Sequence, residues 1–216
     1  MNTELKKVVV IGGGGYAKVV ISIIKELDCY EIYGYTDNAD NGSILGVRYL
    51  GDDKILKEVY SRDNVDKAVL GVGQLQDSTL RRSIVSRLKK IGFFFPAIVS
   101  KTAILSDGVK LGEGTIVRDN STISASSTVG SYSIIGTSAN INHDSTIGSY
   151  SNIAIGSNIG AEVNIGDDVL VGMGTVVMNK INVIDKCLIG AGSLVLKNCE
   201  APGVYYGSPA KKIKGI

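Results

Sequence analysis

The sequence predicts an α/β unit followed by an all-β solenoid, a fold class of α/β plus β. Two observations carry this prediction. A glycine loop separates a strand-like from a helix-like segment near the start, and an aliphatic residue occupies every sixth position through most of the second half. A period of six fits neither an α-helix nor an alternating strand. We therefore expect two domains: a small Rossmann-like parallel sheet with helices over residues 1–96, and coiled short strands with a C-terminal tail over residues 97–216.

The first domain alternates strand-like and helix-like segments, and such alternation indicates a parallel sheet. Aliphatic runs predict the strands, and apolar residues at helical spacing predict the helices. We expect Asp77 to cap the second helix. The expected strands are residues 6–12, 30–37 and 66–73, and the expected helices are residues 16–27 and 77–92.

The loop between the first strand and the first helix is Gly12-Gly13-Gly14-Gly15-Tyr16-Ala17, which fits G-x-G-x-x-A, and Asp37 follows the second strand. Backbone N–H groups and a helix N-terminus there can bind phosphate, and an acid at this distance can bind ribose hydroxyls. The alternative is a glycine-rich turn that only packs tightly. Because a dinucleotide needs two such halves, a single nucleotide, such as that of a nucleotide sugar, fits the short domain better.

The second domain repeats in units of six. All seventeen positions from Val99 to Val195 at this spacing are Val, Leu or Ile, and four residues after each of them stands Ala, Val, Thr, Ser, Ile or Cys. The third and fourth positions are mostly glycine or polar residues, which are typical of corners. Three such units make one 18-residue triangular coil, so this region predicts between five and six coils stacked at strand spacing.

The only histidine of the chain, His143, and the next residue, Asp144, occupy one of these corners. At a corner, neighbouring side chains can both point outward. An imidazole can accept a proton near neutral pH, and an adjacent acid can fix its tautomer. The alternative is an ordinary solvated polar corner. The pair predicts a general base for acyl transfer from a thioester.

The composition argues against several other classes. Lys and Arg number 23 against 21 Asp and Glu, a net charge of +2 that gives no reason to expect nucleic acid as a partner. No apolar run is long enough for a membrane span. The three cysteines are scattered, so we expect reduced thiols and a cytoplasmic protein. A zinc hydro-lyase on such a solenoid needs three histidines, so no metal is expected.

Taken together, the glycine loop, the six-residue repeat, the segment Asn142-His143-Asp144 and the final GVYYGSPAKKIKG resemble the NeuD/PglD group of acetyltransferases. That resemblance implies a left-handed parallel β-helix, a homotrimer with sites between subunits, and acetyl-CoA as co-substrate. It also implies a general-base role for His143, supported by Asp144. Relatives often carry a second histidine where this chain has Asn152. The resemblance implies acetyl-CoA contacts at Asn152, Met173 and Ala191, and nucleotide-sugar contacts at Gly14, Gly15, Tyr16, Asp37, Asn38 and Gly73.

The expected function is direct N-acetylation of the 4-amino group of a nucleotide-linked amino-deoxy sugar. Two alternatives stay open at this point: O-acetylation of a sialic acid on the same fold, and a non-catalytic nucleotide-binding trimeric scaffold. The sequence does not distinguish between UDP, GDP and dTDP as the nucleotide. It also gives no information on the stereochemistry of the sugar, the glycan pathway or the order of substrate binding.

Overall fold

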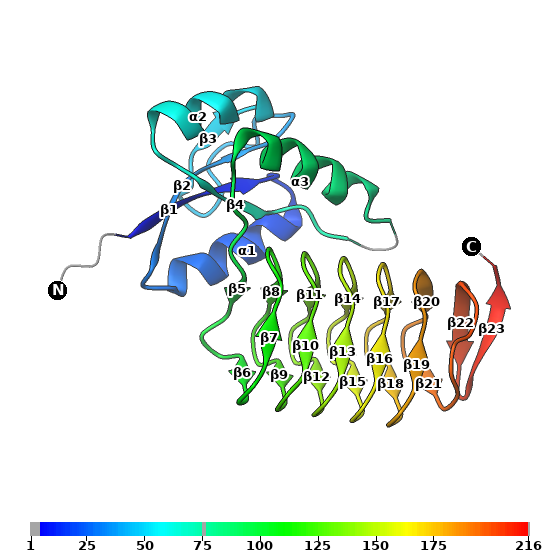
Figure 1. Cartoon of the computed structure of the whole chain (residues 1–216). Coiled ribbons are helices and arrows are strands. Elements are labelled where there is room, and N and C mark those ends of the chain that lie inside the picture. Colours follow the sequence, from blue (N-terminus) through cyan, green and yellow to red (C-terminus); the bar gives the residue numbers. More distant parts are fainter. Residues whose placement is uncertain (1–4, 75–76, 216) are drawn as a thin grey trace. The chain divides into compact units, whose positions relative to one another are not determined.

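The structure is a computed structural model that describes residues 5–74 and 77–215 (Figure 1). These residues fall into two compact units, one made of residues 5–74 and 78–101 and the other of Asp77 and residues 102–215. None of the helices in the described ranges is both long and apolar enough to cross a membrane.

The first unit is built on a parallel four-stranded sheet in the order β3-β2-β1-β4. Figure 1 shows α1 on one face of this sheet and α2 and α3 on the other. Both faces are therefore covered, which explains why β1 is a continuous aliphatic run with Val8, Val9 and Val10 fully buried. The elements are β1 (Lys6–Ile11), α1 (Gly15–Glu26), β2 (Tyr30–Thr36), β3 (Tyr49–Gly51), the 3-10 helix η1 (Asp53–Ile55), α2 (Leu56–Arg62), β4 (Lys67–Leu70), α3 (Thr79–Ile91) and β5 (Ile98–Val99).

Three elements of this unit and one helix cap differ from the sequence prediction. The strand β3, the 3-10 helix η1 and the helix α2 were not predicted, because elements of three to seven residues are too short to show a period. The prediction of Asp77 as N-cap is wrong, since Ser78 is the N-cap of α3 and makes no side-chain cap bond. The Ser78 hydroxyl instead accepts a hydrogen bond from Arg82 Nε at 2.8 Å.

The second unit is a parallel β-helix whose short strands form three faces (Figure 1). The chain passes through the faces in the order I, II, III in every coil. Face I holds β8 (Ile116–Val117), β11 (Ile134–Ile135), β14 (Asn152–Ile153), β17 (Leu170–Val171), β20 (Cys187–Ile189), β22 (Gly203–Gly207) and the antiparallel β23 (Ala210–Lys214). Face II holds β6 (Ile104–Leu105), β9 (Thr122–Ile123), β12 (Asn140–Ile141), β15 (Asn158–Ile159), β18 (Val176–Val177) and β21 (Leu194–Val195). Face III holds β7 (Lys110–Leu111), β10 (Thr128–Val129), β13 (Thr146–Ile147), β16 (Asn164–Ile165) and β19 (Asn182–Val183).

Each coil repeats the one before it at a spacing of 18 residues, as in the pairing of Ile135 with Ile153. The aliphatic residues point inward, and buried hydroxyls connect the coils. Ser145 Oγ donates to the Gly160 carbonyl at 2.9 Å and accepts from the Val163 backbone N–H at 3.1 Å. Where this position of the unit holds serine or threonine, its hydroxyl therefore satisfies backbone groups inside the solenoid.

The corners have one backbone conformation throughout. Every sixth residue from Gly108 to Gly192 has φ between +54° and +75°, and most of these residues are not glycine. A left-handed residue at each corner turns the chain onto the next face. Asp144, with φ +57°, occupies such a position.

Candidate functional site

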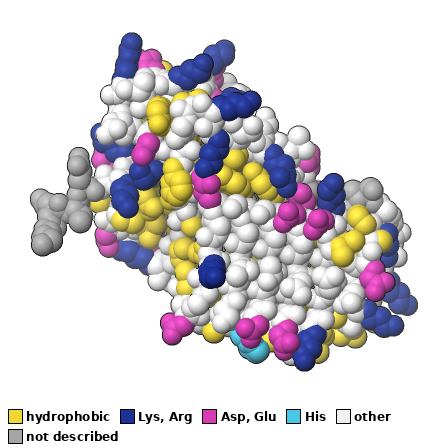
Figure 2. Space-filling model, viewed as in Figure 1, with side chains coloured by type: hydrophobic (Ala, Val, Ile, Leu, Met, Phe, Trp, Pro, Cys, Tyr) yellow, Lys and Arg dark blue, Asp and Glu magenta, His cyan; other side chains and the backbone are white. Residues whose placement is uncertain are grey.

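The predicted pair of His143 and Asp144 forms a hydrogen-bonded dyad at the corner between faces II and III. His143 Nδ1 lies 2.7 Å from Asp144 Oδ2, and both side chains are more than half exposed. In Figure 2 the single histidine lies at the molecular surface beside acidic side chains. Because an ionised carboxylate only accepts hydrogen bonds, we assign the Nδ1 proton to the neutral imidazole. Nε2 then carries the lone pair, and no partner for it is found among the described residues.

Backbone and side-chain contacts hold this dyad from three sides. Asn142 Oδ1 accepts the His143 backbone N–H at 2.8 Å, and the His143 carbonyl accepts the Glu162 N–H at 3.0 Å. The Asp144 backbone N–H donates to the Ala125 carbonyl of the preceding coil at 3.0 Å. The corner is therefore tied to the coils before and after it, and only the imidazole and the carboxylate extend outward.

A second predicted group, Met173 and Ala191, lies in one column at the corner between faces I and II. Backbone hydrogen bonds join successive members of this column: Gly174 N–H donates to the Ile155 carbonyl at 2.9 Å, and Gly192 N–H to the Met173 carbonyl at 2.8 Å. Ile155 and Met173 are exposed apolar side chains. The described protein atoms leave the space beside Gly174 and Gly192 open, since none lies within 4 Å of where a Cβ would stand. This apolar column with open backbone suits an extended pantetheine chain.

The structure does not bring the dyad and this column together within one chain. His143 follows β12 on face II, whereas Met173 follows β17 and Ala191 follows β20 on face I. Asn152 begins β14 on face I and is half-buried. Face II separates the two corners, and it carries a cavity of about 390 Å³ lined by amide and apolar side chains, among them Asn140, Asn142, Asn158, Val176 and Met178.

The predicted nucleotide residues lie at the carboxyl edge of the parallel sheet. Gly14 and Gly15 follow β1, Asp37 and Asn38 follow β2, and Gly73 lies just beyond β4. In the order β3-β2-β1-β4, β1 and β4 flank the point where the chain reverses its direction across the sheet. Ligands of open α/β sheets bind in the crevice at this point.

The four glycines of the loop have different reasons to be glycine. Gly12 has φ +103°, and a Cβ on Gly13 would stand 2.6 Å from the Tyr35 ring, so these two are required by the fold. Gly14 and Gly15 have no described atom within 4 Å of a built Cβ. Gly14 caps α1 without a side-chain hydrogen bond. The N-terminus of α1 therefore faces open space that an anion can approach.

Asp37 contacts the loop directly. Its Oδ2 accepts the Gly13 N–H at 2.5 Å, and its Oδ1 lies 3.4 Å from the Ala39 nitrogen. Tyr16 is half-buried in the first turn of α1 and packs near Gly73. A Cβ placed on Gly73 would lie 3.4 Å from the Tyr16 ring. All six predicted nucleotide-site residues thus gather around the carboxyl ends of β1, β2 and β4.

Sequence reasoning missed Asn142 as part of the dyad's support. The available signal was its position in the repeat. The second position of the other six-residue units holds glycine, serine, alanine, arginine, methionine, isoleucine or leucine, so Asn142 is the single asparagine there. Within the described residues, no group of three His, Cys, Asp or Glu side chains is placed to hold a metal ion.

Comparison with known proteins supports both units. Residues 7–88 match the family model of the PglD N-terminal domain. No curated protein sequence matches the chain. The acetyltransferase domain of PglB from Neisseria gonorrhoeae FA1090, solved also with acetyl coenzyme A, is 25% identical with a TM-score of 0.88, and the match covers 96% of this chain and 100% of that one.

A second similar structure is PerB from Caulobacter crescentus in complex with CoA and GDP-perosamine. It is 28% identical with a TM-score of 0.78, and the match covers 96% of this chain and 97% of that one. A variant of this GDP-perosamine N-acetyltransferase with one histidine replaced by alanine is 27% identical, with the same coverage and TM-score. These similarities confirm the predicted resemblance to the NeuD/PglD group and the predicted fold, a Rossmann-like α/β unit followed by a left-handed parallel β-helix.

Proposed function

We propose that this protein is an acetyl-CoA-dependent N-acetyltransferase that acts on the 4-amino group of a nucleotide-linked amino-deoxy sugar. The observation that carries the proposal is the exposed dyad, in which Asp144 Oδ2 lies 2.7 Å from His143 Nδ1 and leaves Nε2 without a partner among the described residues. The solved structures of similar proteins confirm the coarser predictions, namely an acyltransferase with CoA as co-substrate. PerB, solved with CoA and GDP-perosamine, supports an amino sugar as acceptor.

In the proposed reaction, His143 Nε2 accepts a proton from the sugar amine as its nitrogen attacks the thioester carbonyl. A C–N bond forms, the C–S bond breaks, and the CoA sulfur leaves and takes up this proton from the imidazolium, which restores the neutral base. The Asp144 carboxylate holds the imidazole in orientation and stabilises the positive charge that forms on it. A cysteine nucleophile is not needed, and burial raises the pKa of both solenoid thiols, that of Cys187 and that of Cys199, the latter to about 12.

We propose further that the complete site forms between subunits of a homotrimer. His143 and Asp144 come from one subunit, and Asn152, Met173 and Ala191 come from its neighbour. The supporting observation is the separation of the two corners by face II within a single chain. Asn152 replaces the second histidine of many relatives, and its amide can donate a hydrogen bond to the acyl carbonyl.

The glycine loop provides the nucleotide half of the proposal. Backbone N–H groups at Gly14 and Gly15 and the N-terminus of α1 would hold the phosphates, while Asp37, Asn38, Tyr16 and Gly73 would surround the remaining nucleotide. We place the reaction in the cytoplasm, because the three cysteines are free and one of them, Cys29, is exposed.

The test is release of free thiol from acetyl-CoA by the purified protein, with UDP-, GDP- and dTDP-linked 4-amino sugars and free sialic acid as acceptors. We expect turnover on one amino sugar and a loss of roughly 10²- to 10⁴-fold in His143→Ala, the usual size of a general-base effect. Since the His143 side chain is more than half exposed, we expect this variant to fold normally.

Other outcomes would replace the proposal. Turnover on sialic acid alone would make the product an ester and establish the O-acetyltransferase. No turnover on any acceptor, together with intact nucleotide binding, would favour the non-catalytic scaffold. Full activity in His143→Ala would remove the general-base assignment.

A further inference from the structure

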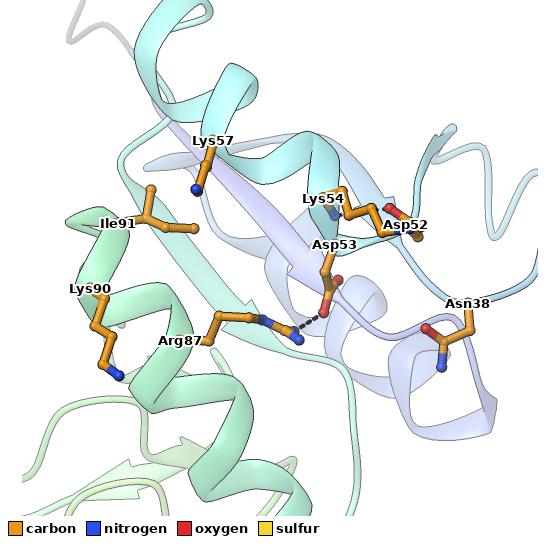
Figure 3. Close-up of a pocket in the computed structure, with 8 residues that line it drawn as sticks. All are labelled: Asn38, Asp52, Asp53, Lys54, Lys57, Arg87, Lys90 and Ile91. Atoms are coloured by element: carbon orange, nitrogen blue, oxygen red, sulfur yellow. Dashed lines mark hydrogen bonds and ion pairs between the residues drawn. The ribbon is translucent and has the colours of Figure 1, made fainter.

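The first unit contains a basic cavity whose charged side chains have no role in the proposed reaction. Its volume is about 520 Å³, and it lies between η1 and α2 on one side and α3 on the other. Figure 3 shows Lys57 and Arg87 extending into the space between these elements, with Lys90 at its edge. Asn38, which follows β2, forms one end of the lining. The cavity is large enough for a small organic ligand.

The charges that line the cavity do not cancel. Four cations, contributed by Lys54, Lys57, Arg87 and Lys90, face two carboxylates, so two positive charges are left over. Lys54 forms an ion pair with Asp52 at 3.3 Å. Neither Lys57 nor Lys90 makes an ion pair with any described residue. A cavity with surplus positive charge favours an anionic ligand.

Arg87 is held in place for such a ligand. Its Nη2 forms an ion pair with Asp53 Oδ2. Asp53 is itself fixed, because its Oδ1 accepts a hydrogen bond from the buried Thr36 hydroxyl at 2.5 Å. The ion pair engages one edge of the guanidinium, and the other N–H groups can donate to an oxyanion. Fixing the arginine in advance lowers the entropy cost of binding.

A ligand for this cavity therefore needs at least two negative charges and several acceptor oxygens. A diphosphate meets both needs, and planar guanidinium forks together with ammonium groups are suited to phosphate oxygens. Asn38 lies directly beside Asp37 in the chain, so the cavity adjoins the residues around the glycine loop. We propose that this cavity is an anion site that binds a diphosphate, either free pyrophosphate or the diphosphate of a nucleotide, through Lys57, Arg87 and Lys90.

The test is calorimetric titration of the full-length protein with inorganic pyrophosphate. The variant Lys57→Gln/Lys90→Gln removes the two unpaired charges. The control Lys110→Gln/Lys186→Gln makes the same change in net charge on the solenoid. We expect the Kd for pyrophosphate to rise about tenfold or more in the first variant, as for the loss of two charge-assisted contacts, and to stay within about twofold of wild type in the control.

Three results would overturn the proposal: no binding to the wild type, an unchanged Kd in the Lys57/Lys90 variant, or equal weakening in both variants. Equal circular dichroism and melting temperature show that each variant folds, as expected for exposed lysines. Titration with UDP, GDP and dTDP then identifies the source of the diphosphate. Weaker nucleotide binding in the Lys57/Lys90 variant places the nucleotide's own diphosphate in the cavity, and unchanged nucleotide binding makes it a separate site for pyrophosphate.

Discussion

Mixing two inactive variants tests whether the proposed site is shared between subunits. His143→Ala removes the base at the corner between faces II and III, and Ala191→Tyr fills the column at the corner between faces I and II. These corners lie on opposite edges of face II in one chain. Both residues are exposed, so both variants are expected to fold and assemble. Each variant alone has every site damaged.

The expected recovery follows from counting sites in a ring of three. If each site takes His143 from one subunit and Ala191 from the next, a mixed trimer of either composition has roughly one site in three with both residues intact. Random assembly of equal amounts gives mixed trimers in about three quarters of the population. Their product predicts recovery of about one quarter of wild-type turnover.

The assay is thiol release from acetyl-CoA after the two variants are unfolded together and refolded. The reference is a sample in which each variant is refolded separately before the two are combined, so that each trimer contains one variant only. A matched control combines His143→Ala with Asp144→Ala, whose defects lie at the same corner, so mixing should produce no gain. Native mass spectrometry shows whether mixed trimers have formed. Mixed trimers without recovered activity would refute a site shared between these two corners.

Three further predictions concern single residues. Asp144→Asn should lower kcat/KM about tenfold at unchanged folding, because asparagine tolerates positive φ while the carboxylate charge is lost; unchanged kcat/KM would mean that this charge plays no part. Ser145→Ala should reduce the free energy of unfolding by about 1–3 kcal/mol, measured in urea, since buried backbone groups of the next coil lose their partner. Iodoacetamide at about pH 8 should label Cys29 alone, because burial raises the pKa of Cys187 and Cys199 and hides both thiols; mass spectrometry of the native and the unfolded protein checks this.

The solenoid could be predicted almost completely from the sequence, because its structure repeats with its sequence. Each aliphatic residue of the six-residue unit is one inward side chain, and each 18-residue shift is one strand pairing, as between Ile141 and Ile159. The separation of the two corners was also available from spacing. His143 and Met173 are 30 residues apart (173 − 143), which is not a multiple of 18, so the two residues cannot share a column.

The first unit was less predictable because its short elements depend on tertiary contacts. The strand β3 has three residues and is defined by its pairing with β2, for example Tyr35 with Tyr49. The four glycines look alike in sequence, yet only Gly12 and Gly13 are required by the packing of the loop. The basic cavity was invisible, since Lys57 and Lys90 are 33 residues apart (90 − 57) and meet only when α2 and α3 pack on one face of the sheet.

The position of the dyad in the repeat explains how two consecutive residues can act together. On a strand, neighbouring side chains point to opposite faces, so consecutive residues cannot share a surface. At a corner, the positive φ of Asp144 turns the chain, and its side chain and that of His143 both face outward. Every coil from Gly108 to Gly192 has this corner conformation. The solenoid therefore supplies the geometry of a dyad at each corner, and placing one imidazole and one carboxylate there supplies the chemistry without any change in the fold.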